Sequence, residues 1–174
     1  VGEVVGCGRG RANLDKALQL GIIDRCEADP ARAVEGADMV LVAVPLGAMR
    51  EVFAAIGDAL APDAVVTDAG SAKSCVVEDL REIFGAPPPF FVPGHPIAGT
   101  EKSGAAAAFP DLYTGRRVIL TPLAETSPGA RERVRWMWEA VGAVVEEMEV
   151  GHHDEILAAT SHLPHLLAYA LVDA

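Results

Sequence analysis

Segments with strand character and segments with helix character alternate along most of this 174-residue sequence. The strongest strand is predicted at residues 38–44, which are apolar on both faces, as in the buried centre of a parallel sheet. An amphipathic helix follows at residues 46–60, and the next strand is predicted at residues 64–67. Repeated strand–helix units of this kind build a mostly parallel sheet with helices packed on its faces. The sequence therefore predicts an α/β fold.

The other predicted elements continue the pattern. Strands are predicted at 3–7, 22–23, 90–92, 117–120 and 144–148, and helices at 12–20, 30–35, 72–84 and 127–141. Ser127 caps the last of these helices, whose Trp136 and Met137 are predicted to face the core. From about residue 151 the pattern is purely helical. We therefore predict two domains, an α/β domain over residues 1–150 and the start of an all-helical domain over residues 151–174.

Composition excludes several classes of partner. The chain carries 14 Lys and Arg against 25 Asp and Glu, a formal net charge of −11. Such acidity disfavours nucleic acid and anionic membrane surfaces as partners, and no apolar run reaches the roughly 18 residues of a membrane span. Cys7, Cys26 and Cys75 form neither a metal pattern nor a disulfide framework. We expect reduced thiols in a cytoplasmic protein.

Both ends of the sequence have the character of internal segments. The first residue is Val1 rather than Met, and it leads directly into a strand pattern. Residues 166–174 are an apolar helical run without a stop signal. We expect a fragment that is truncated on both sides.

The glycine-rich stretch at residues 6–11 is a candidate for cofactor binding. It does not match the dinucleotide fingerprint G-x-G-x-x-G, because Arg11 or Asn13 stands where the third glycine is needed. It is compatible with the end of the second strand of a dinucleotide-binding fold, where an acid takes the ribose hydroxyls or arginines take a 2′-phosphate. Gly8 stands in place of the acid, beside Arg9 and Arg11, which favours NADP. The alternative is a glycine-rich turn with solvated arginines.

Two further strand ends offer a surface for a ligand. Val44 ends the strand at 38–44 and Pro45 follows it. These two residues either line a cofactor or serve only to end the strand and begin the next helix. Ser71 follows the strand at 64–67 and is predicted to cap the helix at 72–84. Its hydroxyl either serves as a cap alone or also faces a ligand, and Lys73 adds a positive charge nearby.

His95 is the leading candidate for acid–base chemistry. It lies between Gly94 and Pro96, after the apolar strand at 90–92. Glycine permits close approach and proline restrains the backbone, so the imidazole is predicted to be held rigidly at a strand end. Imidazole can accept a proton from a hydroxyl group that is being oxidised. The alternative is a buried histidine satisfied by the backbone.

A second group of histidines lies near the end of the chain. His162 and His165 are three residues apart and would share a helix face, while Pro164 between them interrupts the helical hydrogen bonds and favours a shaped pocket wall. No cysteine or carboxylate completes a recognisable ligand pattern, so we predict no metal site. His152 and His153 precede this group, and the alternative for the whole cluster is a helix start with exposed histidines.

The two histidine motifs carry a family resemblance. Residues 94–104, Gly-His-Pro-Ile-Ala-Gly-Thr-Glu-Lys-Ser-Gly, together with residues 160–165, Thr-Ser-His-Leu-Pro-His, resemble the prephenate/arogenate dehydrogenases of tyrosine biosynthesis. Residues 68–73 and 20–24 also fit that pattern. The resemblance implies a Rossmann-like nucleotide-binding domain followed by a helical, dimerising domain. It also implies oxidative decarboxylation of prephenate or arogenate, with NAD or NADP as the hydride acceptor.

The resemblance also implies roles for particular residues. His95 matches the catalytic base, and Ser71 matches the serine that orients the substrate hydroxyl beside the nicotinamide. His165 and Glu101 match substrate-site positions, and His162 either orients its helix or contacts the cofactor. The family's first strand and glycine-rich loop have no counterpart here, and its substrate-binding arginine falls beyond residue 174. We therefore expect that this fragment alone is not an active enzyme.

Two other functions remain open at this stage. One is another NAD(P)-dependent small-acid or imine reductase on the same scaffold, which would lack the paired histidine motifs. The other is a non-catalytic nucleotide-binding module, which would bind a nucleotide without oxidising either substrate.

Overall fold

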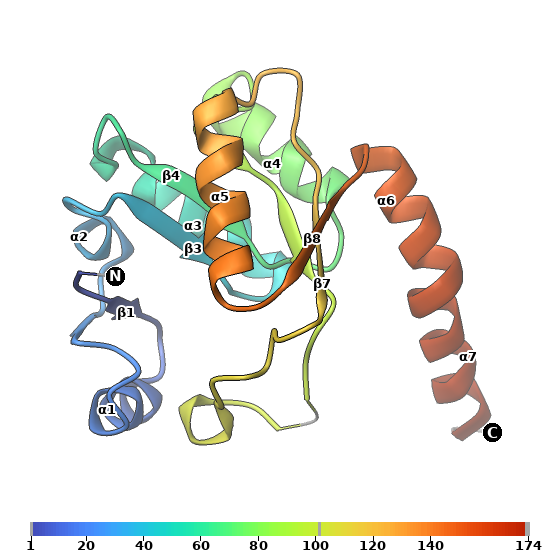
Figure 1. The fold of residues 1–174 in the computed structure, drawn as a ribbon, viewed down its shortest axis with the longest axis horizontal. Helices are drawn as coiled ribbons and strands as arrows, with labels where there is room; N and C mark the ends of the chain where they lie inside the picture. Colours follow the sequence, from blue (N-terminus) through green and yellow to red (C-terminus); the bar gives the residue numbers. More distant parts are fainter. Residues whose placement is uncertain (1, 101, 173–174) are drawn as a thin grey trace.

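The computed structural model describes residues 2–100 and 102–172, and within them an α/β body carries two outlying parts (Figure 1). The centre of the body is a parallel sheet in the order β3–β4–β5, formed by Met39–Val42, Val65–Asp68 and Phe91–Val92. Helices α3 (Leu46–Ile56) and α4 (Ser74–Phe84) make the crossovers between these strands. The predicted α/β fold with a Rossmann-like, mostly parallel sheet is confirmed.

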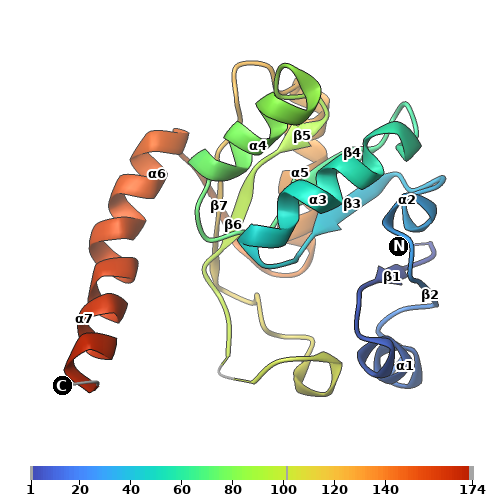
Figure 2. The same cartoon turned by 180° about the vertical axis from the view of Figure 1, so that it is seen from behind.

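Helices cover both faces of this sheet. Figure 2 shows α3 and α4 together on one face, and Figure 1 shows α5 (Pro128–Ala140) on the other. A short 3-10 turn, η1 (Gly57–Ala59), extends α3, and Gly85 ends α4 with a φ of 76°, a conformation that favours glycine. The sheet is thus the middle layer of three.

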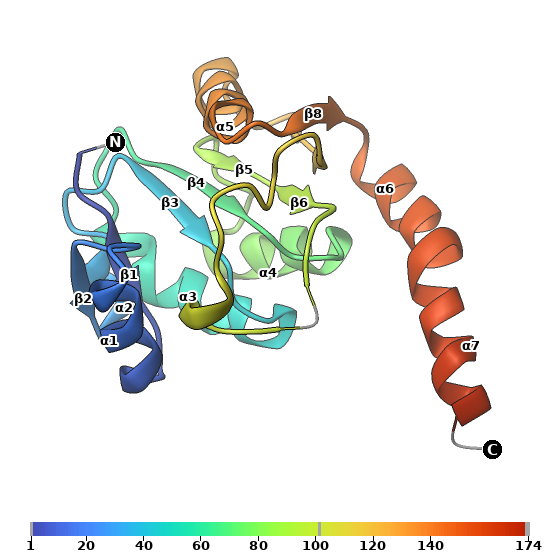
Figure 3. The same ribbon diagram turned by 60° about the horizontal axis from the view of Figure 1, so that its bottom comes forward.

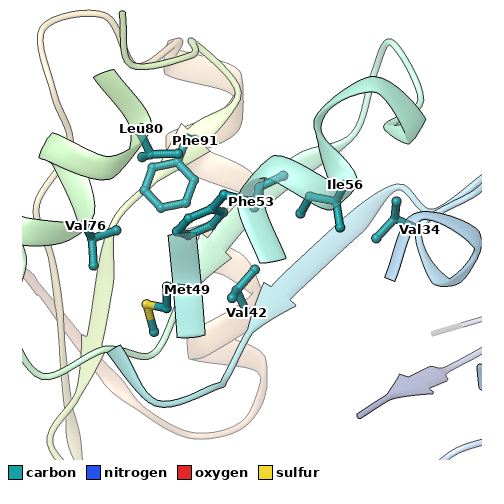
Figure 4. Packing of buried hydrophobic residues seen from close by; sticks show 9 residues of the cluster. Val34, Val42, Met49, Phe53, Ile56, Val76, Leu80 and Phe91 are labelled. Atoms are coloured by element: carbon teal, nitrogen blue, oxygen red, sulfur yellow. The ribbon is translucent and has the colours of Figure 1, made fainter. Parts of the chain in front are cut away.

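The apolar core between the sheet, α3 and α4 explains why these elements pack together. Figure 4 shows Phe53 of α3 against Phe91 of β5, with ring centroids 5.4 Å apart in an edge-to-face arrangement. Met49 and Leu80 are essentially inaccessible to solvent and extend the same cluster. Side chains spaced three or four residues apart on each helix supply this face, so helical periodicity alone determines which residues enter the core.

A second, smaller sheet continues from the first. Strand β6 (Gly94–Pro96) pairs antiparallel with β7 (Arg117–Leu120), which pairs parallel with β8 (Val144–Glu147). Only Pro93 separates β6 from β5. Proline has no N–H to donate to a sheet, and its carbonyl accepts from Thr121. The chain therefore changes pairing partner at Pro93, and His95 lies inside β6 rather than at the end of the predicted strand.

The N-terminal part forms a separate strand pair to one side of the body, as Figure 3 shows. Its elements are β1 (Val5–Cys7), α1 (Arg11–Gln19), β2 (Arg25–Glu27) and α2 (Pro30–Ala33), and β1 and β2 are parallel. The strand predicted at 22–23 is wrong. Those residues belong to the turn after α1, where the Ile23 side chain covers Gly6 so closely that an added Cβ would lie 2.6 Å from it.

The C-terminal part is helical and projects away from the body (Figures 1 and 3). Helix α6 (Val150–Leu157) runs into a π-helical turn, η3 (Ala158–His162), and then into α7 (Leu163–Val172). Pro164 is the second residue of α7, just beyond this turn, in agreement with the predicted interruption of the helical hydrogen bonds. No helix within the described residues has both the length and the apolar character needed to cross a bilayer.

Two burial predictions need correction. Trp136 is 66% exposed, because α5 turns Ala130, Val134 and Trp138 toward the sheet instead, at a spacing of four residues. Strand β3 is apolar as predicted, but it is not buried on both faces, since Leu41 is 42% exposed.

Candidate active site

The candidate site is built around His95, whose strand is held close to β4. A Cβ built on the preceding Gly94 would lie 2.9 Å from the backbone oxygen of Asp68 and 3.1 Å from Thr67 Oγ1. Glycine is therefore the residue that lets β6 approach β4. The His95 side chain is nearly buried, with 9% of the residue exposed.

His95 is hydrogen-bonded to a histidine from α6. Its Nδ1 lies 2.9 Å from Nε2 of His153, and the two ring centroids are 5.1 Å apart. His153 is wholly buried, and its Nδ1 lies 2.7 Å from Oδ1 of Asp154. The side chains of His95, His153 and Asp154 thus form a continuous chain of hydrogen bonds.

Asp154 also binds the beginning of α4. Its Oδ1 accepts from the backbone N–H of Lys73 at 2.8 Å, and its Oδ2 accepts from that of Ser74 at 2.8 Å. A carboxylate at this position satisfies N–H groups that the first helical turn leaves unpaired, and it interacts favourably with the helix dipole. The same side chain therefore anchors α6 on α4 and supports His153.

A buried ion pair lies behind the His95 strand. Asp68, at the end of β4, pairs with Lys73, and both side chains are fully buried. Lys73 Nζ also donates to the carbonyl of Gly94 at 2.7 Å, and Asp68 accepts from the N–H groups of Gly94 and Gly70 at 3.1 Å and 2.8 Å. Burial raises the pKa of Asp68 and lowers that of Lys73, and their mutual attraction opposes both shifts.

The surroundings of His95 favour its neutral form. Burial lowers the pKa of His95 from 6.5 to about 4, with smaller contributions in the same direction from His153, Lys73 and His162. Asp154 acts in the opposite direction. Near neutral pH the His95 imidazole therefore has a lone pair available to accept a proton.

Asp154 is held in its charged form. Burial alone would raise its pKa, but hydrogen bonds from the side chain and backbone of Ser74, the backbone of Lys73 and the ring of His153 outweigh that effect. The pKa of this carboxyl group is therefore well below its usual range.

Ser71 does not cap a helix, contrary to the prediction. Helix α4 begins at Ser74 with Lys73 at the N-cap position, and no side chain of the N-cap residue bonds the first turn. Ser71 is exposed in the loop between β4 and α4, three residues beyond Asp68. The cap comes from Asp154, on an element more than 70 residues away, so local sequence had no means of revealing it.

The other predicted substrate residues lie partly outside the described part of the structure. His162 is exposed in the π-helical turn η3 and is close enough to His95 to influence its pKa. His165 belongs to α7, but its side chain lies outside the described residues, as does the whole of Glu101.

The predicted cofactor residues lie in two loops. Gly8 and Arg9 are exposed in the turn after β1, and a Cβ built on Gly8 would meet no atom within 4 Å. Arg11 begins α1 and pairs with Asp15 at 3.0 Å, both side chains being solvated. Val44 and Pro45 lie in the loop from β3 to α3, with Val44 packed against the apolar core.

The charge of these loops and the open space around them are compatible with a bound dinucleotide. An open glycine turn with two exposed guanidinium groups can accommodate an anion such as a 2′-phosphate. However, Glu27 at the end of β2 is the register partner of Cys7 at the end of β1, and it places an acid beside this turn. Its carboxylate accepts from the N–H groups of Ala28 and Asp29. The turn is thus compatible with NAD as well as NADP.

Sequence reasoning missed the partners of His95. The alternative of exposed histidines at the helix start is wrong for His153, which is wholly buried, and holds for its neighbour His152, which is exposed. The one sequence signal that could have indicated a histidine–aspartate hydrogen bond is that Asp154 directly follows two histidines. Among the described residues, no group of His, Cys, Asp and Glu is arranged to hold a metal ion.

Comparisons with known proteins agree with this architecture. The family model for the nucleotide-binding domain of prephenate dehydrogenase matches residues 2–147. The cyclohexadienyl dehydrogenase of Zymomonas mobilis is 42% identical over 158 residues, which cover 91% of this chain and 53% of that protein. The chain spans about half the length of the curated relatives it matches.

Two solved structures share the fold. Prephenate dehydrogenase from Aquifex aeolicus, in complex with hydroxyphenyl propionate and NAD+, has a TM-score of 0.91 at 41% identity, covering 99% of this chain and 60% of that one. Arogenate dehydrogenase from Synechocystis has a TM-score of 0.85 at 26% identity, covering 97% of this chain and 59% of that one.

Proposed function

Because this chain belongs to the prephenate dehydrogenase family, we propose that it carries the nucleotide-binding domain and the catalytic base of an NAD- or NADP-dependent dehydrogenase of prephenate or arogenate. The observation that supports this most directly is the environment of His95. Its imidazole is held on a strand, engaged at Nδ1 and neutral near pH 7.

His95 and Ser71 are the proposed catalytic residues. His95 accepts the proton of the substrate's ring hydroxyl, and Ser71 orients that hydroxyl. The loop that carries Ser71 starts at Asp68, which also binds the backbone of Gly94, so a short path of hydrogen bonds connects the two sites. His165, Glu101 and His162 are the proposed substrate-binding residues.

The proposed cofactor residues are Gly8, Arg9, Arg11, Val44 and Pro45, together with Ser71. The nicotinamide supplies the acceptor for the hydride that leaves the carbinol carbon. Arg9 and Arg11 would bind the adenosine end, and a 2′-phosphate there would be matched by their charge.

In the proposed reaction, His95 accepts the hydroxyl proton while the hydride leaves the carbinol carbon. Breaking the hydroxyl O–H bond toward His95 raises the electron density at the carbinol carbon, which favours departure of the hydride. Loss of carbon dioxide then makes the ring aromatic, and the proton on His95 is available to return to the phenolate oxygen. A positioned base of this kind contributes on the order of 10²–10⁴ in rate.

Organisation and location complete the proposal. Residues 1–150 form the nucleotide-binding domain, and residues 151–174 begin a helical substrate and dimerisation domain. Helix α7 is apolar around its circumference, with Leu166, Leu167 and Leu171 more than half exposed. A helix of this kind is buried in a complete protein, which fits a homodimer. The three free cysteines fit a cytoplasmic location.

The test is a spectrophotometric assay of the intact protein with prephenate and arogenate, each with NAD+ and NADP+. We expect oxidation of at least one substrate. His95→Asn is expected to reduce turnover by roughly 100-fold or more while leaving nucleotide affinity nearly unchanged, because only the proton acceptor is removed.

The matched control is His152→Asn, which removes an exposed imidazole and is expected to retain activity. Nucleotide binding without oxidation of either substrate would contradict the proposal. So would parallel losses of turnover and nucleotide affinity in His95→Asn.

A further inference from the structure

The hydrogen bonds behind His95 determine which of its nitrogens carries a proton. Asp154 Oδ1 accepts from the N–H of Lys73, and Oδ2 accepts from the N–H of Ser74. An ionised carboxylate has no proton to donate, and the low pKa of Asp154 keeps it ionised. The 2.7 Å contact between Asp154 and His153 therefore requires a proton on Nδ1 of His153.

The same reasoning extends one ring further. A neutral imidazole has one donor and one acceptor nitrogen, so His153 with a proton on Nδ1 accepts at Nε2. The atom 2.9 Å away is Nδ1 of His95, which must then be the donor. The lone pair of His95 is left on Nε2, the nitrogen that faces away from this chain of bonds.

We propose that His153 and Asp154 are positioning residues that fix His95 as its Nδ1–H tautomer, so that Nε2 is the proton acceptor in the reaction proposed above. This inference rests on the proposed function for its kinetic consequence but not for the tautomer itself.

The arrangement also accommodates the protonated state. When the substrate O–H bond breaks and the Nε2–H bond of His95 forms, Nδ1–H continues to donate to His153. No second proton has to move, and Asp154 stays ionised. The charge that develops on His95 thus meets an aligned acceptor, backed by a carboxylate that Lys73, Ser74 and His153 hold in place.

The first experiment reads the tautomers directly. Nitrogen-15 NMR of the imidazole rings, in the intact protein near pH 7, is expected to show protons on Nδ1 of both His95 and His153. A proton on Nε2 of His95, or a doubly protonated His153, would overturn the inference. This measurement needs no substrate and no variant, so it remains decisive even if a substitution prevents folding.

The second experiment tests the kinetic role. In Asp154→Asn the amide cannot accept at both positions, and wherever its NH₂ group faces His153 it imposes the wrong tautomer on both rings. We expect kcat to fall by roughly 100-fold or more with KM changed by less than about threefold. His95 should then lose its Nδ1–H signal in the nitrogen-15 spectrum.

A conservative pair of substitutions separates positioning from packing. His153→Leu removes the acceptor, whereas the side-chain oxygen of His153→Gln can still accept from His95, so His153→Gln should retain more of the wild-type kcat. The control is Glu149→Gln, which removes a charge from the N-terminus of the same helix, where the side chain accepts from backbone N–H groups. It is expected to keep the wild-type kcat.

The outcomes distinguish the two proposals. If the unmodified protein oxidises neither substrate, the proposed function fails, while the tautomer result stands on its own. If the unmodified protein is active but Asp154→Asn and His153→Leu retain its kcat within about twofold, the positioning role is overturned.

Discussion

At the scale of single residues, the site depends on how burial and neighbouring charges act on titratable groups. His95 and Asp154 belong to one chain of hydrogen bonds, yet one is held neutral and the other charged. His95 loses solvation and faces other basic groups, whereas Asp154 receives hydrogen bonds from a helix N-terminus. Both groups are thus deprotonated near pH 7, and strongly shifted pKa values of this kind are typical of acid–base sites.

The lowered pKa of His95 has a consequence for stability. Between pH 6.5 and about 4 the unfolded chain binds more protons at this ring than the folded chain does. The free energy of unfolding is therefore expected to fall as the pH falls through that window. Urea denaturation at about pH 7 and about pH 5 measures the effect. His95→Asn should lose less unfolding free energy between these two pH values than the unmodified protein does. His152→Asn should lose as much as the unmodified protein. Identical losses in all three would contradict the assigned environment.

At the scale of elements, helix ends and helix faces follow different rules. The buried face of a helix follows from its own periodicity, as Met49 and Phe53 of α3 show. A helix end can instead be completed by a distant element, as Asp154 of α6 completes α4. Local capping signals therefore predicted Ser127 of α5 correctly, where the hydroxyl accepts from Ala130, and predicted Ser71 wrongly.

Helix α5 offers a matched pair of substitutions. Trp138 is 2% exposed and packs edge-to-face on Tyr113, whereas Trp136 is 66% exposed. Trp138→Ala is expected to lower the free energy of unfolding by about 3–5 kcal/mol because it leaves a cavity, and Trp136→Ala by less than about 0.5 kcal/mol. Urea denaturation measures both. Because the buried indole N–H has no hydrogen-bond partner among the described residues, Trp138→Phe should cost less than Trp138→Ala. Equal effects of the two alanine substitutions would contradict the orientation of α5.

At the scale of the whole molecule, one buried ion pair joins the two sheets. Asp68 ends β4 of the first sheet, and Lys73 binds both Asp68 and the carbonyl of Gly94 in the second. The strand that carries His95 is thus fixed to the loop that carries Ser71 by charge-assisted hydrogen bonds between groups that are inaccessible to solvent. Such groups are strongly coupled because no water replaces a lost partner.

Removing one partner of this pair is expected to be costly. Lys73→Met leaves the Asp68 carboxylate buried without its cation, and we expect the free energy of unfolding to fall by about 3–5 kcal/mol. Arg50→Met is the control. It removes exposed ion pairs with Asp79 and Glu82 and should leave stability nearly unchanged. Urea denaturation compares the two variants, and similar effects would show that the Asp68–Lys73 pair is not structurally important.

The amino-acid sequence by itself determined the α/β class, the alternation from β3 to α4 and the motifs that identify the family. These features depend on local periodicity and on short, contiguous residue patterns. Only the tertiary structure decided which groups surround His95: a histidine and an aspartate nearly 60 residues away, and a lysine–aspartate pair from another strand and loop. Local sequence cannot specify such contacts, because they arise only when sheets and helices have packed and the solvent between them has been excluded.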